Sequence, residues 1–125
     1  MPLVTIRYTP KIASFGDLTT IAHNLRDTVA KALSCSEPGG ELHTRDVEIM
    51  ALPIGPHDSV LGEFDVVITI DAHDKPSRRN NLEAISQSIA GAIVEWRAHK
   101  YIRRWSFTVW VRLFIGSFVS SQSVG

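Results

Sequence analysis

Pro2, directly after the initiator methionine, has the most distinctive chemistry of any residue in this chain. Methionine is normally removed before a small residue such as proline, and the chain would then begin with a secondary amine. A general base works best when its pKa lies near the working pH. An α-amine has a pKa of about 8, and an apolar pocket or a neighbouring cation would lower this pKa to about 6.5. The sequence therefore suggests proton transfer by an amino-terminal proline. The alternative is an ordinary strand start.

Four basic residues and one aromatic residue are candidates for the rest of such a site. They are His43, Arg45, Lys75, Arg79 and Trp110. A cation among them would bind a substrate carboxylate and stabilise a developing enolate, and the indole would form part of an apolar wall. Each of the four basic residues also has a simpler explanation, because basic residues are common on solvated surfaces and in loops.

Acidic residues and histidines gather in two short stretches, His57–Asp58 and Asp71–Asp74. Neither stretch supplies the three or four ligands of a protein zinc site. Cys35 is the one cysteine, which excludes an internal disulfide and a paired-cysteine metal site. We therefore expect neither a metal nor another cofactor.

The composition limits the possible partners. The 13 basic and 13 acidic residues give a formal net charge of zero, which argues against a nucleic acid held by phosphate neutralisation. The most apolar run, 105–119, contains an arginine and is shorter than the roughly 20 residues that span a bilayer. No signal peptide is visible. We expect a cytoplasmic protein with neither a membrane nor a nucleic-acid partner.

Apolar periodicity predicts the elements that must position the candidate residues. Alternation indicates strands over 3–8, 46–52, 63–70 and 107–115. A 3.6-residue apolar stripe indicates one helix over 18–33 and a second that runs from Ser77 to about Trp96. Asp17 and Ser77 are the expected N-caps, and Pro38–Gly40 is expected to end the first helix.

The two halves of the chain repeat this pattern at an offset of about 60 residues, so that Leu25 corresponds to Ile85. The repeat divides a single domain, 1–125, into pseudo-repeats at about 2–52 and 62–115 and a small-residue tail at 116–125.

A duplicated β-α-β unit folds with right-handed parallel crossovers. The predicted fold class is therefore α+β, with a four-stranded sheet and two helices on one face. The other face would carry Leu3, Val67, Trp110 and Phe114. Because this face is too apolar for water, we expect other copies of the chain to cover it in a homo-oligomer.

The strand that begins Met1-Pro2-Leu3-Val4-Thr5-Ile6, followed by this duplication, resembles the tautomerase superfamily. Residues 45–72 most resemble the 5-carboxymethyl-2-hydroxymuconate isomerase family, with an arginine before strand two, a His-Asp pair in the next loop and an apolar third strand. The resemblance implies a trimer or hexamer, with a trimer expected here, in which Pro2 is the catalytic residue.

The family's substrate-binding arginines match this sequence unevenly. The arginine before strand two falls at His43, and Arg45 follows two residues later. The arginine after strand three falls at Asp74, with Lys75 beside it and Arg79 just beyond. The resemblance therefore implies a small-molecule carboxylate substrate but does not extend to a dicarboxylate.

The resemblance implies a tautomerase or isomerase that moves a proton in an unsaturated 2-oxo or 2-hydroxy acid, with Pro2 as the general base. A non-catalytic oligomeric or ligand-binding protein of the same fold is the alternative. RNA-recognition modules share the order of elements, but residues 63–68 lack their aromatic signature. The natural substrate, and the choice between isomerisation, decarboxylation and dehalogenation, stay open.

Overall fold

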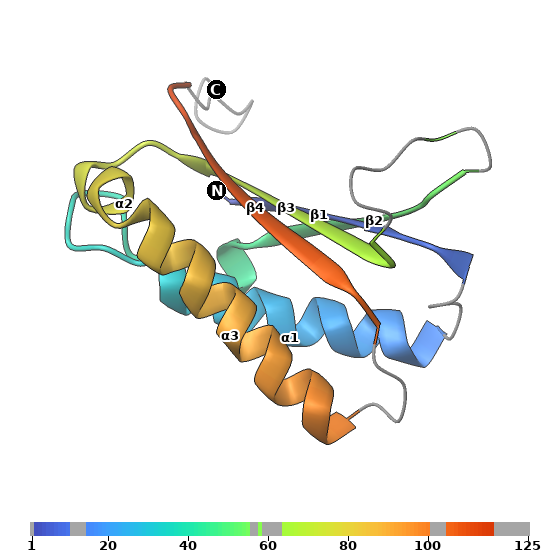
Figure 1. Cartoon of the computed structure of the whole chain (residues 1–125). Coiled ribbons are helices and arrows are strands. Elements are labelled where there is room, and N and C mark those ends of the chain that lie inside the picture. The colour runs from blue at the N-terminus through green and yellow to red at the C-terminus, as the bar shows by residue number, and fades with distance from the viewer. Residues whose placement is uncertain (1, 11–14, 56–57, 59–63, 101–104, 117–125) are drawn as a thin grey trace.

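Four strands form one mixed sheet in the order β2-β1-β3-β4 (Figure 1). They are β1 (Leu3–Tyr8), β2 (Glu48–Pro53), β3 (Val66–His73) and β4 (Phe107–Phe114). The β1 strand pairs parallel with β2 and antiparallel with β3, while β3 pairs parallel with β4. The computed structural model describes residues 2–10, 15–55, 58, 64–100 and 105–116. The two outer pairs of the sheet are thus parallel crossover units joined through an antiparallel centre.

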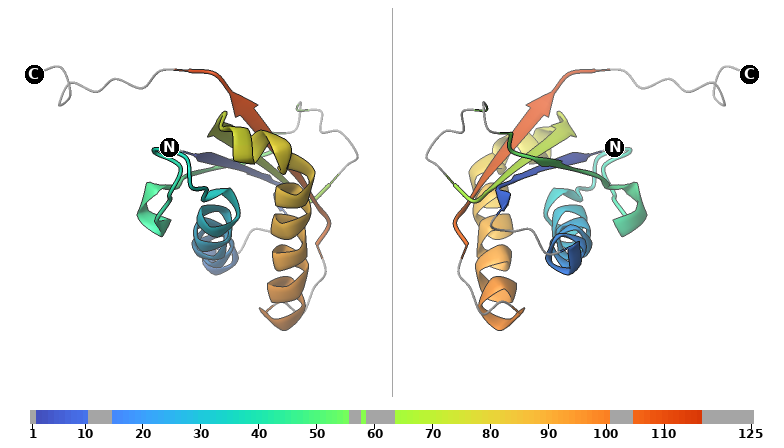
Figure 2. Two further views of the ribbon diagram at one scale, coloured as in Figure 1. Left: turned by 90° about the vertical axis from the view of Figure 1, so that its left-hand side faces the viewer. Right: turned by 90° about the vertical axis from the view of Figure 1, so that its right-hand side faces the viewer.

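Two long helices lie side by side on one face of this sheet (Figure 2). The helices are α1 (Phe15–Leu33), the short α2 (Pro76–Asn80) and α3 (Leu82–Lys100), and a 3-10 turn, η2 (Thr44–Asp46), precedes β2. No helix in the described ranges is long and apolar enough to cross a membrane. The predicted fold class, α+β with a four-stranded sheet and its helices on one face, is confirmed.

The core lies between the helices and one face of the sheet. Along β3 buried and partly exposed residues alternate without a break, as expected when helices cover only one face of a strand. The predicted helical stripes meet this face, and their central members are buried. Those members are Leu25, Val29, Leu33, Ile85, Ile89 and Ile93. The apolar periods of the sequence therefore identify the core correctly.

The predicted bounds of three strands are wrong, and of these β4 differs least, because it ends at Phe114 rather than at residue 115. The β2 strand spans Glu48–Pro53 rather than 46–52, because Thr44–Asp46 form η2 and Val47 is its C-cap. The β3 strand spans Val66–His73 rather than 63–70. Directly before it, the Asp65 N–H donates to Ser106 Oγ and the Ser106 N–H donates to Asp65 Oδ2, both at 3.0 Å. Side chains satisfy these two amides, and the regular ladder starts one residue later.

The predicted helix caps are also wrong. The α1 helix begins at Phe15, which leaves Asp17 inside its first turn. Its end at Leu33 is as predicted, but the expected stop, Pro38–Gly40, lies further along in the loop that follows. The α2 helix has Lys75 as its N-cap, with a proline at the first helical position, so Ser77 lies inside the helix. The predicted second helix is divided in two, because a short segment, α2, precedes α3.

The face of the sheet that the helices leave uncovered is called the open face below. It carries four exposed large apolar side chains, Met50, Leu52, Trp110 and Phe114. Ion pairs lie towards its two ends, Arg7 with Asp58 and Arg112 with Asp71. The exposed apolar side chains of the open face therefore lie on the two outer strands, while its central strands pair Thr5 with Thr69.

Candidate active site

Pro2 directly precedes β1, at the end of the sheet beside α2 and the loop that follows α1 (Figure 1). Its side chain is fully buried. On one side, the Pro2 carbonyl accepts a hydrogen bond from the Glu48 N–H at 3.0 Å. On the other side, Leu3 lies opposite Asp71, and continuing this register brings Pro2 opposite the buried Ala72. The proline is thus held between the start of β2 and the end of β3.

His43 and Arg45 belong to the segment that leads into β2, at the same end of the sheet as Pro2. Both side chains are exposed. The backbone here forms η2, and the His43 N–H donates to Asp46 Oδ2 at 2.8 Å. His43 and Arg45 therefore do not lie on one extended segment, because the backbone forms a 3-10 turn from Thr44 to Asp46.

Lys75 and Arg79 follow β3, and each already has a partner in the chain. Lys75 Nζ donates to the Pro38 carbonyl at 2.8 Å, which leaves two of its three N–H donors for other acceptors. Arg79 forms a two-point ion pair with Asp74, at 3.2 and 2.8 Å. This hydrogen bonding lowers the pKa of Asp74 and raises the pKa of Arg79. Lys75 is therefore the more available cation of the two.

Trp110 is too exposed in a single chain to form the wall of an active site there. It lies on the open face in the middle of β4, opposite Thr69 in the register, and 63% of its surface is exposed. The guanidinium of Arg112 lies 5.5 Å from the centre of its ring. Within one chain, Trp110 does not join the cluster of candidates at the sheet end where Pro2 lies.

Arg78 is the residue at this end of the sheet that sequence reasoning missed. It is 3% exposed and is the one buried charged side chain among the described residues. Arg78 Nε donates to the Leu33 carbonyl at 2.9 Å, which satisfies a carbonyl at the carboxyl end of α1. Arg78 and Arg79 are adjacent residues of the same type, so the sequence gives no reason to expect one to be buried and the other exposed. Only the orientation of α2 distinguishes them.

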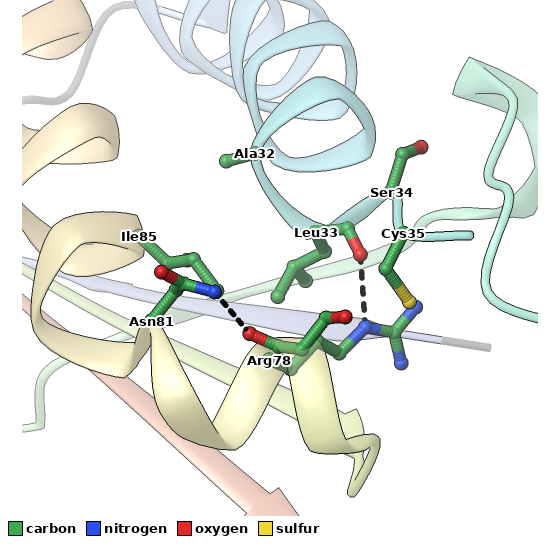
Figure 3. A pocket seen from close by; sticks show the side chains of 8 residues that line it. Ala32, Leu33, Ser34, Cys35, Arg78, Asn81 and Ile85 are labelled. Carbon is green, nitrogen blue, oxygen red and sulfur yellow. Dashed lines mark hydrogen bonds between the residues drawn. The ribbon is translucent and has the colours of Figure 1, made fainter. Parts of the chain in front are cut away.

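A pocket of about 210 Å3 lies next to Arg78, between the end of α1 and the α2–α3 junction (Figure 3). It is lined by Ala32, Leu33, Ser34, Cys35, Ser77, Arg78, Asn81 and Ile85. Most of its polar groups already have partners, such as Asn81 Nδ2, which donates to the Ser77 carbonyl at 2.7 Å. The pocket is thus a small cavity at the helix junction, on the helix side of the molecule.

Glu37 fastens the loop after α1 to the start of α2. Its Oε1 accepts the Ser77 N–H at 2.7 Å. Hydrogen bonds from the Ser77 side chain and backbone, and then from Cys35, hold the pKa of Glu37 at about 2, below its ordinary value of 4.5. Gly40 closes the loop, because a Cβ at that position would clash with Cys35 Sγ and lie 2.9 Å from the Glu37 carbonyl. The sequence did not predict this junction.

The two histidine-acid stretches do not assemble a metal site in the part of the chain that the structure describes. No three His, Cys, Asp or Glu side chains gather there in a metal-binding arrangement. His57 lies outside the described residues, and Asp58 instead binds Arg7 at 3.0 Å. In the other stretch, His73 Nε2 lies 3.0 Å from the Gly116 carbonyl.

Comparison with known proteins gives matches in structure and none in sequence. No family profile and no curated protein matches the chain. Malonate semialdehyde decarboxylase superposes with a TM-score of 0.65 at 11% identity, over 97% of this chain and 93% of the other. For 5-carboxymethyl-2-hydroxymuconate delta-isomerase the TM-score is 0.55 at 14% identity, over 97% and 86%. The chain has the tautomerase fold.

A third similar structure is a fused 4-OT described as a symmetric trimer, with a TM-score of 0.53 at 11% identity over 98% of each chain. The decarboxylase is also known as a variant in which its first-residue proline is replaced by alanine. At these identities the likeness establishes the tautomerase fold, and the activity has to be argued from the site.

Proposed function

We propose that this protein is a tautomerase-type isomerase that moves a proton in an unsaturated 2-oxo or 2-hydroxy acid. In this proposal Met1 is removed and the free nitrogen of Pro2 acts as the general base. The burial of Pro2 carries the proposal, because apolar surroundings favour the neutral form of an amine. The fold shared with a hydroxymuconate isomerase and a semialdehyde decarboxylase supports it.

The proposed reaction needs only proton transfers. The neutral nitrogen of Pro2 takes the hydroxyl proton of an enol, and the electron pair forms the ketone while a carbon of the conjugated chain becomes nucleophilic. The protonated proline then returns the proton to that carbon. Atoms and electrons balance without a cofactor, and a cation beside the substrate carboxylate would stabilise the enolate-like transition state.

The proposed cations are Arg45 and Lys75, which lie on the two segments on either side of Pro2. Arg45 has an exposed side chain, and Lys75 uses one donor on a backbone carbonyl. His43, also exposed, would help to orient the substrate or carry a proton. Arg79 is a weaker candidate because Asp74 already matches its charge.

We also propose that the protein is a homotrimer built through the open face. The exposed apolar side chains there would then be covered by neighbouring copies, and the fused 4-OT of the same fold is a symmetric trimer. In such an assembly Trp110 would lie between subunits. A contribution of Trp110 to substrate binding would therefore be made across the interface.

A non-catalytic protein of the same fold is the second candidate. It is favoured by one observation, that both candidate cations after β3 already bind groups of the chain itself, Lys75 a carbonyl and Arg79 a carboxylate. Such a protein would keep the trimer and show no dependence of any proton transfer on Pro2.

Tautomerisation of phenylenolpyruvate, compared between wild type and Pro2→Ala, decides between the two candidates. We expect kcat/KM to fall by about a hundredfold or more, the usual contribution of general acid–base catalysis. Intact mass is measured first on both proteins. A retained Met1 would acylate the proline nitrogen and contradict the proposal, as would equal rates in the two proteins.

A second comparison, Arg45→Ala against Arg79→Ala, identifies the cation that binds the substrate carboxylate. We expect the larger rise in KM in Arg45→Ala, because the Arg79 charge is already paired with Asp74. The reverse order would move the carboxylate site to the segment after β3.

A further inference from the structure

Arg78 has three hydrogen-bond partners, and they come from three separate segments of the chain. Nε donates to the Leu33 carbonyl at the end of α1 and Nη1 to the His73 carbonyl at the end of β3, both at 2.9 Å. Nη2 donates to the Gly40 carbonyl in the loop after α1, at 3.4 Å. One guanidinium thus fixes these three segments relative to one another.

Two of these three segments run on to either side of Pro2. The loop that contains Gly40 continues through η2 into β2, where the Glu48 N–H donates to the Pro2 carbonyl at 3.0 Å. His73 is the last residue of β3 and directly follows Ala72, the residue that lies opposite Pro2 when the β1–β3 register is continued. The Arg78 guanidinium therefore joins the backbone of the two segments that lead to either side of Pro2.

An arginine suits this position better than any other side chain. Its planar guanidinium carries five N–H donors in fixed directions, whereas a lysine ammonium is a single point on a flexible stem. The carboxyl end of α1 also supplies unpaired carbonyls that favour a cation. The clamp has neighbours, since Glu37 and Lys75 bind across the same junction. Loss of Arg78 would therefore loosen the junction without opening it.

We propose that Arg78 is the positioning residue of the Pro2 site, fixing the loop after α1 and the end of β3 at the spacing that orients the Pro2 nitrogen towards substrate. The proposal rests on the proposed function, in which that nitrogen is the general base. Arg78 itself is buried on the helix side and touches no reacting atom. It acts through the backbone on either side of the proline.

The test compares Arg78→Met with Arg97→Met. Arg97 is the matched control because it also donates to a backbone carbonyl, that of Trp105, and lies against the Phe107 ring. Phe107 pairs with Val66, and Val66 pairs with Tyr8, so Arg97 is at the opposite end of the sheet from Pro2. Both variants lose a partly or fully buried arginine–carbonyl contact.

In phenylenolpyruvate tautomerisation we expect Arg78→Met to lower kcat about tenfold or more with little change in KM, because misplacement of a catalytic group costs rate. Arg97→Met should keep the wild-type kcat. Arg78→Lys should recover only part of the loss. In Arg78→Ala, added methylguanidinium should restore activity, because the pocket of about 210 Å3 beside Arg78 gives it access. Equal loss of kcat in Arg78→Met and Arg97→Met, or no loss in Arg78→Met, would overturn the proposal.

A second measurement needs no substrate. Hydrogen exchange of the Glu48 amide reports directly on the bond to the Pro2 carbonyl, and we expect it to be about tenfold faster in Arg78→Met. It should be unchanged in Arg97→Met. If Pro2→Ala and wild type are equally active, the proposed function fails, and this amide still decides whether Arg78 positions Pro2. Unchanged exchange in Arg78→Met would overturn the positioning role whatever the activity.

Discussion

The two faces of the sheet are built from alternate residues of the same four strands, yet in a single chain one face is buried and the other is exposed. On the helix side Ile68 and Ile70 are fully buried. On the open face Trp110 and Phe114 are 63% and 47% exposed. Both sets are apolar, so side-chain type does not explain the difference. The difference lies in what covers them. Two helices cover one face, and no part of the described chain covers the other.

The exposed apolar side chains of the open face indicate that something covers it. They lie on the two outer strands, Met50 and Leu52 on β2 and Trp110 and Phe114 on β4. Among the described residues, the helix side has no such exposed residues on its strands, because its apolar residues are covered within the chain. Large apolar side chains left exposed on a sheet face are typical of an interaction surface, which supports the proposed trimer.

The largest effect should come from truncating the helix-side face. We expect Ile68→Ala to lower the free energy of unfolding by about 2–5 kcal/mol, the usual cost of truncating a buried Leu or Ile. Val67→Ala, next to it on the open face, should cost clearly less, because Val67 is partly exposed in one chain. Urea unfolding at one fixed protein concentration measures both values. Equal losses would mean that Val67 is as buried in solution as Ile68, as it would be if a neighbouring copy in the proposed trimer covered it.

The next effect should be on assembly rather than on stability of the chain. Trp110→Glu places a charge among the exposed apolar side chains of the open face, and we expect the molar mass in solution to fall from that of a trimer to that of a monomer. Val94→Glu is the matched control, because Val94 is an exposed apolar residue on α3, away from the open face. Sedimentation equilibrium measures both. A monomeric wild type, or a trimeric Trp110→Glu, would contradict the proposal that the open face is the trimer interface.

The smallest effect should be on acid stability, and it tests the helix side alone. The folded pKa of Glu37, about 2, lies below its ordinary value of 4.5. The stabilisation that its ionised form gives is therefore complete above about pH 4.5 and is lost as the pH falls towards 2. We expect wild type to lose more stability across this window than Glu37→Gln.

The exposed Glu95 on α3 gives the control variant, Glu95→Gln, which should follow the wild-type acid curve. Unfolding measured at several pH values between 6 and 2.5 compares the three proteins. A Glu37→Gln curve parallel to that of wild type would show that the bond between Glu37 and Ser77 does not stabilise the folded state.

Most of the fold could be predicted because apolar periodicity depends on which residues face the core. The alternation in the strands and the stripe through Leu25 and Ile85 identified the sheet, the helices and the buried face. Element ends were predicted less well. Ser77 has the type of an N-cap, but Lys75 and the proline after it define the start of α2. A cap depends on local backbone direction, which residue type alone does not set.

The sequence by itself determined the α+β class, the two-sided sheet and the place of Pro2 at the head of the first strand. The tertiary structure alone decided the roles of the basic residues. Arg78 and Arg79 are adjacent and chemically identical, yet one binds three backbone carbonyls in the interior and the other binds Asp74 at the surface. The reason is geometric. Which arginine meets the end of α1 depends on how α2 is oriented, and contacts between segments far apart in the chain set that orientation.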